Sequence, residues 1–127
     1  MSVRGLEKDI ERWLGNQLKP RGFLYYKFVS PANPGVPDRI VVCPDGTAWF
    51  VELKTRRGSA GPAQLVHLAM LAAHGQRTAL VKGWEDARKF CAMLLAEHAA
   101  RGPIEPVWGR PLPLRGRGPE SESGGKI

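Results

Sequence analysis

The sequence predicts an α/β domain in which helices pack against a small sheet. Three stretches carry apolar residues at helical spacing, and four shorter stretches are rich in β-branched and aromatic residues. Their order along the chain is helix, three strands, helix, strand and helix. With 127 residues, 43% of them hydrophobic, the chain is long enough for one domain with a modest core.

The first helix is expected from residue 5 to about residue 21, where Pro20-Arg21-Gly22 ends it. Glu7 falls inside the apolar face of this helix, and Glu11 lies at its margin. A carboxylate in an apolar stripe is costly to bury unless something binds it. Alternatively, Glu7 is a first-turn acid that favours the helix dipole. Both interpretations stay open. The apolar face consists of Leu6, Ile10, Trp13, Leu14 and Leu18.

A strand and a hairpin follow the first helix. Residues 23–29 are rich in aromatic and β-branched side chains with some alternation, which predicts a strand, and the Pro- and Gly-rich segment 30–37 is expected to be a loop. In residues 37–54, two short apolar runs flank the turn Pro44-Asp45-Gly46. This pattern predicts a β-hairpin that begins at an aspartate, Asp38, and closes with Glu-Leu-Lys.

One end of the predicted hairpin gathers charged residues. Because side chains alternate along a strand, Glu52 and Lys54 point to one face and Val51 and Leu53 to the other. Pairing across the turn then places Asp38 near Glu52. Two neighbouring carboxylates repel each other unless a cation lies between them, and oxygen ligands suit Mg²⁺. The simpler alternative is a solvated Glu-x-Lys pair of little energetic value.

The second half of the chain supplies two helices and a strand. The loop 55–61 is basic and follows Lys54 directly. Pro62 favours the start of a second helix, with Gln64 in its first turn and Gly75 at its end. A strand is expected within residues 77–82. A third helix then begins near Trp84 and runs to about Ala100. The apolar face of the second helix is formed by Leu65, Leu68, Ala69, Leu71 and Ala72.

The net charge of +7 favours a polyanionic partner, either nucleic acid or an anionic membrane surface. No apolar run is long enough to span a bilayer, and the N-terminus lacks the apolar core of a signal peptide. Cys43 and Cys91 are isolated, which predicts free thiols in a reducing compartment. His67, His74 and His98 have no metal-ligand spacing and are expected at the surface or the core edge.

From Arg101 onward the composition changes to alternating Pro, Gly and Arg. We therefore expect a domain over residues 1–109 and a basic, flexible tail over residues 110–127, with a short edge strand at 104–108. The tail is a candidate nucleic-acid arm, although a merely solvated tail is the alternative.

The motifs resemble those of the virus-type replication-repair nuclease (VRR-NUC) family within the PD-(D/E)xK restriction-endonuclease-like superfamily. The matching residues are Pro34-Gly35-Val36-Pro37-Asp38, Phe50-Val51-Glu52-Leu53-Lys54 and Gln64, together with Glu7 on the first helix. The resemblance covers roughly residues 6 to 89. It implies the αβββαβα core of that superfamily, with a mixed central sheet flanked by helices.

The resemblance implies a metal-dependent endodeoxyribonuclease whose catalytic residues are Glu7, Asp38, Glu52, Lys54 and Gln64. Asp38, Glu52 and the Leu53 carbonyl would bind Mg²⁺ or Mn²⁺, with Glu7 bound directly or through a water. Lys54 would position the attacking water and help to deprotonate it. Gln64 would orient Lys54 or the water. Whether one or two metal ions bind stays open.

The family resemblance also implies partners. The substrate is expected to be DNA, with a preference for branched forms such as four-way junctions, and the protein is expected to be a homodimer in the cytoplasm of a bacterial or phage-infected cell. No membrane or small-molecule partner is expected. The DNA-binding candidates are Arg56, Arg57, Lys82, Arg110, Arg115 and Arg117. The alternatives are a non-catalytic DNA-binding module of the same fold and a nickase or flap nuclease without junction resolution.

Overall fold

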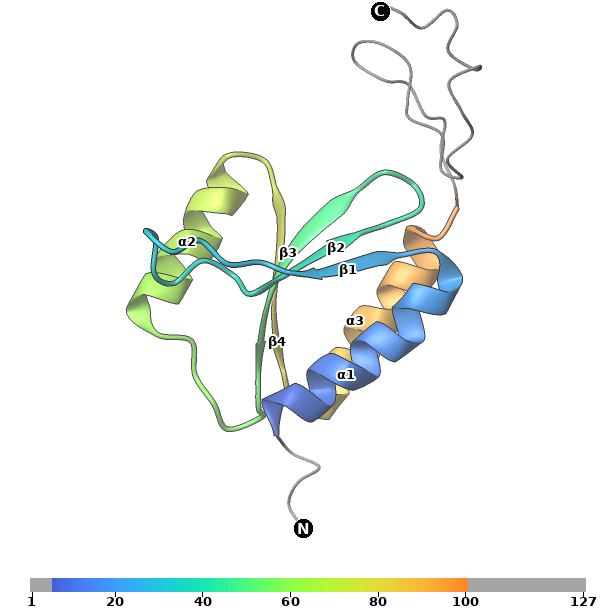
Figure 1. Ribbon diagram of the computed structural model, residues 1–127, viewed down its shortest axis with the longest axis horizontal. Coiled ribbons are helices and arrows are strands. Elements are labelled where there is room, and N and C mark those ends of the chain that lie inside the picture. Colours follow the sequence, from blue (N-terminus) through green and yellow to red (C-terminus); the bar gives the residue numbers. More distant parts are fainter. Residues whose placement is uncertain (1–5, 101–127) are drawn as a thin grey trace, which may run out of the picture.

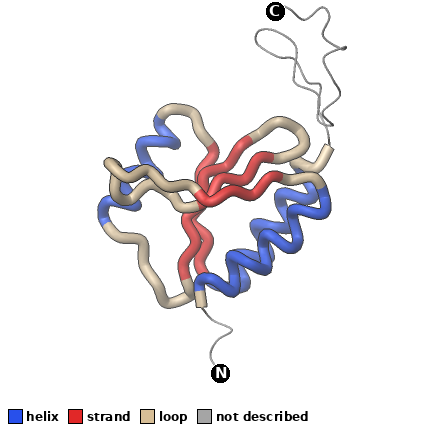
Figure 2. Tube along the Cα trace, in the orientation of Figure 1, coloured by secondary structure: helices blue, strands red, loops and turns tan. Residues whose placement is uncertain are grey.

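The computed structural model describes residues 6–100, and its elements follow the predicted order (Figures 1 and 2). The edge strand expected at 104–108, the domain boundary at 109 and the tail arginines lie outside the described residues. The elements are α1 (Glu7–Leu18), the 3₁₀ turn η2 (Lys19–Arg21), β1 (Leu24–Lys27), β2 (Arg39–Val42), β3 (Ala48–Lys54), α2 (Pro62–Ala73), β4 (Arg77–Lys82) and α3 (Gly83–Glu97).

The four strands form one mixed sheet in the order β1-β2-β3-β4. The pairs β1–β2 and β2–β3 are antiparallel, whereas β3 and β4 run parallel because α2 carries the chain back between them. The predicted hairpin is confirmed: Arg39 stands opposite Val51, and Val42 stands opposite Ala48. Gly46 closes the turn at φ +93°, in the left-handed region that favours glycine.

The helices cover the sheet unequally. In Figure 1, α1 and α3 lie side by side on one side of the sheet, and α2 lies on the other. The core forms between the sheet and the α1–α3 pair, where Trp13 meets Trp84 edge-on with ring centroids 6.0 Å apart. Its fully buried side chains include Ile10, Leu14, Leu18, Val41, Val51, Leu53 and Leu94. The apolar face predicted for the first helix is therefore confirmed, except for Leu6, which is 45% exposed.

The apolar face predicted for the second helix is not buried in α2. None of the 12 residues of α2, all of them described, is buried. Leu65, Val66 and Met70 are about half exposed, at 50%, 54% and 48%. The physical reason is that α1 and α3 shield each other, whereas α2 stands by itself on its side among the elements drawn in Figure 1.

The prediction of free thiols is confirmed, because Cys43 and Cys91 are both buried and unpaired among the described residues, and the reducing compartment stays a prediction. Burial raises the pKa of each thiol, which disfavours the reactive thiolate. Among residues 6–100, no helix has both the length and the apolar character that crossing a membrane requires.

Candidate active site

The hairpin brings the predicted charged residues together. Because Arg39 stands opposite Val51, the next position along the ladder places Asp38 beside Glu52. The Glu52 side chain is almost fully buried, at 2% exposure, and its Oε2 lies 3.4 Å from Lys54 Nζ. Val51 and Leu53 point into the core on the opposite face. The backbone of Leu53 thus lies between the two charged residues, and the metal-binding role expected of its carbonyl stays a prediction.

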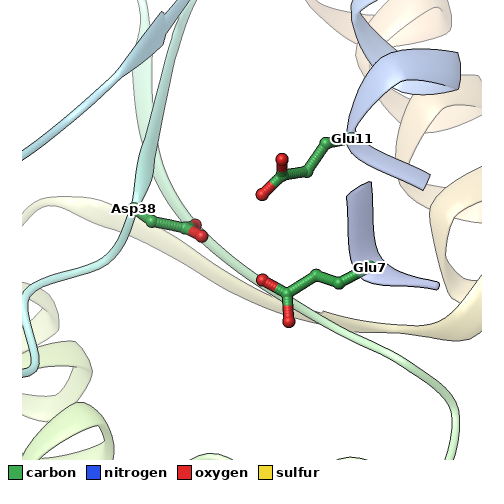
Figure 3. A group of neighbouring side chains, drawn as sticks. All are labelled: Glu7, Glu11 and Asp38. Carbon is green, nitrogen blue, oxygen red and sulfur yellow. The ribbon is translucent and has the colours of Figure 1, made fainter. Parts of the chain in front are cut away.

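The first helix adds two carboxylates to this end of the hairpin. One oxygen each of Glu7, Glu11 and Asp38 lies within 4.8 Å of the others, and Figure 3 shows the three side chains converging from α1 and from the start of β2. Glu7 was expected here. Glu11 was not chosen from the sequence as a site residue. Its four-residue spacing from Glu7, which places both on one helix face, is the signal that could have found it.

Glu11 has a second contact that fixes its position. Its Oε1 accepts a hydrogen bond of 3.0 Å from Arg39 Nη2, and both side chains are largely buried. The Arg39 guanidinium lies over the Tyr25 ring, 5.1 Å from its centroid. Tyr25 in turn donates its hydroxyl to the Glu11 carbonyl at 2.9 Å. This contact network joins α1 to the first two strands beside the acidic residues.

The carboxylates of the site are electrostatically strained. Burial raises the pKa of Glu7, Asp38 and Glu52, and in each case a neighbouring carboxylate raises it further. That neighbour is Asp38 for both glutamates and Glu11 for Asp38. The positive charge of Lys54 lowers the pKa of Glu52, but this effect offsets only part of the rise that burial and Asp38 cause. The protein's own cations therefore leave the negative charge of this cluster incompletely balanced.

Two oxygens of the cluster fit a metal ion. Asp38 Oδ1 and Glu52 Oε1 are two of the five side-chain atoms of the described residues that are buried without a hydrogen-bond partner; the others are Asp9 Oδ2, Arg39 Nε and Trp49 Nε1. Most buried polar side-chain atoms have such a partner, because leaving one unpaired costs about 1–3 kcal/mol. Hard divalent cations such as Mg²⁺ bind carboxylate oxygens of this kind. The donor set is therefore suited to an oxygen-preferring divalent cation.

Gln64 contacts the cluster differently from expectation. Its Nε2 donates a 2.8 Å hydrogen bond to Glu52 Oε2, whereas the sequence interpretation had it orient Lys54 or a water. Its Oε1 accepts a 2.7 Å bond from the amide of Gly61, the N-cap of α2, which is the half of a capping box that a glycine N-cap allows. Gln64 and Lys54 together hold Oε2 of Glu52, and its Oε1 is the oxygen left without a partner.

The structure describes three of the six DNA-binding candidates. Arg56 and Arg57 are exposed on the loop that follows β3, and Lys82 stands opposite Lys54 in the parallel pair of strands. Arg110, Arg115 and Arg117 lie outside the described residues.

His98 lies far from the site: its Nδ1 is 2.7 Å from Asp45 Oδ2 at the turn of the hairpin, a contact that sequence reasoning did not foresee.

Comparisons with known proteins identify a relative of the chain and solved structures with the same fold. No family model matches the chain. A curated relative, "Putative nuclease p44" of Acyrthosiphon pisum secondary endosymbiont phage 1, is 42% identical over 71 residues, which are 56% of this chain and 76% of the relative. Two solved structures share the fold. A "VRR_NUC domain" matches 72% of this chain and 95% of its own at a TM-score of 0.63 and 24% identity. A "VRR_NUC domain protein" matches 72% and 88% at a TM-score of 0.58 and 19% identity. The solved structures match the restriction-endonuclease-like α/β fold of the chain, and the phage relative matches its sequence. Together with the acidic end of the hairpin, these matches show that the chain belongs to the VRR-NUC family.

Proposed function

We propose that the protein is a metal-dependent endonuclease that hydrolyses phosphodiester bonds in DNA. The observation that carries this proposal is the pair of buried, unpartnered oxygens of Asp38 and Glu52 beside Lys54. Asp9, which pairs with Arg12, also leaves one buried oxygen unpaired, but only at the hairpin do two such oxygens come from residues in neighbouring positions of paired strands, among the described residues. The phage relative, whose name describes a nuclease, supports the proposal.

The metal ligands in this proposal are Asp38, Glu52 and the Leu53 carbonyl, with Glu7 binding directly or through a water. The ion is Mg²⁺ or Mn²⁺, both of which accept oxygen ligands. When bound, it supplies a lowered pKa for the attacking water and positive charge for the phosphate in the transition state. Glu11 faces the same space, and its Arg39 partner holds it within reach of Asp38.

The remaining site residues position the reactants. Lys54 orients the attacking water and stays anchored by Glu52 Oε2. Gln64 donates to the same Oε2 atom, so that both partners of Glu52 hold one oxygen and leave Oε1 without a partner. Arg56, Arg57 and Lys82 contact the phosphate backbone on either side of the cleaved bond, which aligns the strand without reading its sequence.

The proposed substrate is branched DNA, including four-way junctions, and the proposed assembly is a homodimer in the cytoplasm. One chain carries one set of Asp38, Glu52 and Lys54, so paired cuts in a symmetric junction need two chains related by a two-fold axis. The half-exposed apolar residues of α2 offer a surface for that pairing: Leu65, Val66 and Met70. Residues 1–109 would form the nuclease domain, and the tail after residue 109 would add nonspecific DNA affinity.

The test is cleavage of a supercoiled plasmid that extrudes a cruciform, with Mg²⁺, by the wild type and two variants. Glu52→Gln should remove cleavage, and Glu97→Gln, at an exposed carboxylate near the end of α3, should leave it unchanged. Coordinated cuts give linear product directly, whereas independent cuts pass through a nicked circle. Wild-type cleavage by pure Glu52→Gln protein would end the proposed mechanism. A monomer in sedimentation that accumulates only nicked circles would reduce the protein to a nickase.

A further inference from the structure

A cleft of about 780 Å³ opens beside the acidic cluster. It lies between the loop that follows β3 and the first turns of α3, and its volume falls in the range of about 300–1,000 Å³ that is usual for ligand pockets. The residues that line it include Leu6, Thr55, Arg56, Arg57, Trp84 and Arg88. The proposed function already uses Arg56 and Arg57 as phosphate contacts, but it gives no role to Trp84 or Arg88.

The cleft adjoins the candidate active site along the chain. Leu6 immediately precedes Glu7, and Thr55 immediately follows Lys54. The lining of the cleft therefore continues along the chain directly from Glu7 on α1 and from Lys54 on β3. The cleft is therefore a candidate binding place for a part of the DNA next to the phosphate at the cluster.

The walls of the cleft combine aromatic and cationic side chains. Trp84 packs edge-on against Trp13, which fixes the orientation of its ring. Arg56, Arg57 and Arg88 are exposed and bring three positive charges. The cleft also contains one carboxylate, Glu85, whose Oε2 lies 3.5 Å from Lys89 Nζ.

A single glycine sets the shape of this cleft. Gly83 begins α3 at φ +80°, and a Cβ there would stand 2.9 Å from the Cβ and 3.1 Å from the Cα of Arg56. The absence of a side chain at Gly83 lets the arginine-bearing loop lie directly against the start of α3. The two walls are thus held at a fixed separation by a backbone contact.

An aromatic ring with nearby arginines is the combination that binds unpaired nucleotides, since the base stacks and the backbone phosphate meets the guanidinium groups. A base inside a duplex is stacked and paired and is not free to enter such a cleft. We propose that the cleft takes one unpaired nucleotide of the substrate, with its base against Trp84 and its phosphate on the arginines. This inference rests on the proposed nuclease function and supplies a physical basis for a preference for branched over continuous DNA.

The test uses the fluorescent base 2-aminopurine, which is quenched by stacking, in DNA bound without divalent cation so that no cleavage occurs. The probe is placed at unpaired positions beside a branch and, in a second substrate, inside continuous duplex. The wild type should quench the probe at one unpaired position and leave the duplex probe unchanged. Trp84→Leu should lose the quenching and weaken binding to branched DNA by about tenfold, and Trp84→Phe should retain both.

Two exposed arginines give a matched pair that does not depend on the tryptophan. Arg88→Ala should weaken binding to branched DNA several-fold more than binding to continuous duplex, whereas Arg77→Ala, at the start of β4 and not lining the cleft, should affect both equally. Equal effects of the two substitutions, or no quenching at any unpaired position by a wild type that binds and cuts DNA, would overturn the inference and leave the nuclease function standing. A wild type that cuts no DNA with Mg²⁺ would overturn both.

Discussion

Replacing Asp38 with asparagine should remove cleavage and make the fold more stable. The substitution keeps the shape of the side chain and removes one charge from the acidic cluster. Burial and the charge of Glu11 raise the pKa of Asp38, so the folded state resists its ionisation. An acid with a raised pKa makes the fold less stable once the pH exceeds its ordinary range. The gain from Asp38→Asn should therefore be present at neutral pH and vanish near pH 3, where aspartate is protonated in both states.

The size of the gain follows from the geometry. Two unit charges 4.8 Å apart, the upper limit among the oxygens of Glu7, Glu11 and Asp38, repel by about 3.5 kcal/mol at an effective dielectric constant of about 20. The nearby cations Arg39 and Lys27 offset part of this repulsion, and partial protonation relieves more. We expect a net increase of about 1 kcal/mol in the free energy of unfolding, which is about 4–8 °C in Tm for a domain of this size.

The turn of the same hairpin provides a matched control. Asp45 accepts hydrogen bonds from the Thr47 backbone amide and hydroxyl and lies beside His98, and these contacts lower its pKa from 3.8 to about 2. A lowered pKa stabilises the fold above pH 3.8, and the effect is lost as the pH falls through 2. Asp45→Asn should thus lower Tm at neutral pH, the opposite sign from Asp38→Asn, and the difference from wild type should shrink toward pH 2.

Thermal melts of both variants and the wild type in chelator, from pH 2 to pH 8, measure these effects. Adding Mg²⁺ at neutral pH should raise the Tm of the wild type but not that of Asp38→Asn, because a ligand that binds only the native state stabilises it. If Asp38→Asn melts below the wild type at neutral pH in chelator, charge repulsion does not govern this cluster, and the reasoning is refuted.

Three further outcomes follow from named contacts. Gly35→Ala should destabilise the fold more than Gly46→Ala in chemical denaturation: both residues have φ +93°, but a Cβ at position 35 would lie 2.7 Å from backbone at the start of α2, and one at position 46 meets nothing within 4 Å. Gln64→Ala should lower the unfolding free energy by about 1 kcal/mol and reduce cleavage without abolishing it, because it removes the hydrogen bond to the Gly61 amide and one of two partners of the buried glutamate; unchanged kinetics would contradict this. Changing both Arg56 and Arg57 to alanine should weaken the salt dependence of DNA affinity. In titrations at several salt concentrations, the slope of log affinity against log salt concentration should become shallower by about 1.8.

The elements themselves were predictable because their patterns are local. The helical period around Leu14, the alternation from Val51 to Lys54 and the turn at Gly46 each follow from residues close in sequence. The exposure of α2 was not predictable in this way. Leu65 and Met70 look the same in sequence whether a helix packs over them or not, and burial depends on which elements share a face of the sheet.

The site was predictable as far as strand pairing determines it. Alternation and hairpin register place Asp38 beside Glu52 without further information. The partner of Gln64 depends instead on where α2 sits relative to β3, so its bond to Glu52 rather than Lys54 could not be read from the sequence. The cleft beside the site joins segments around residues 6, 56 and 84, and no local pattern reports such a junction.

The central claim is that this acidic cluster binds a divalent cation and cuts DNA with it. The most direct measurement is Mg²⁺-initiated cleavage of branched DNA by wild type and Asp38→Asn purified in parallel, with Mn²⁺ binding to each protein measured by titration calorimetry. The account predicts that the wild type binds the metal and cuts, and that Asp38→Asn remains folded, loses metal binding and does not cut. Equal cleavage by the two proteins, or cleavage by the wild type in excess chelator, would contradict it.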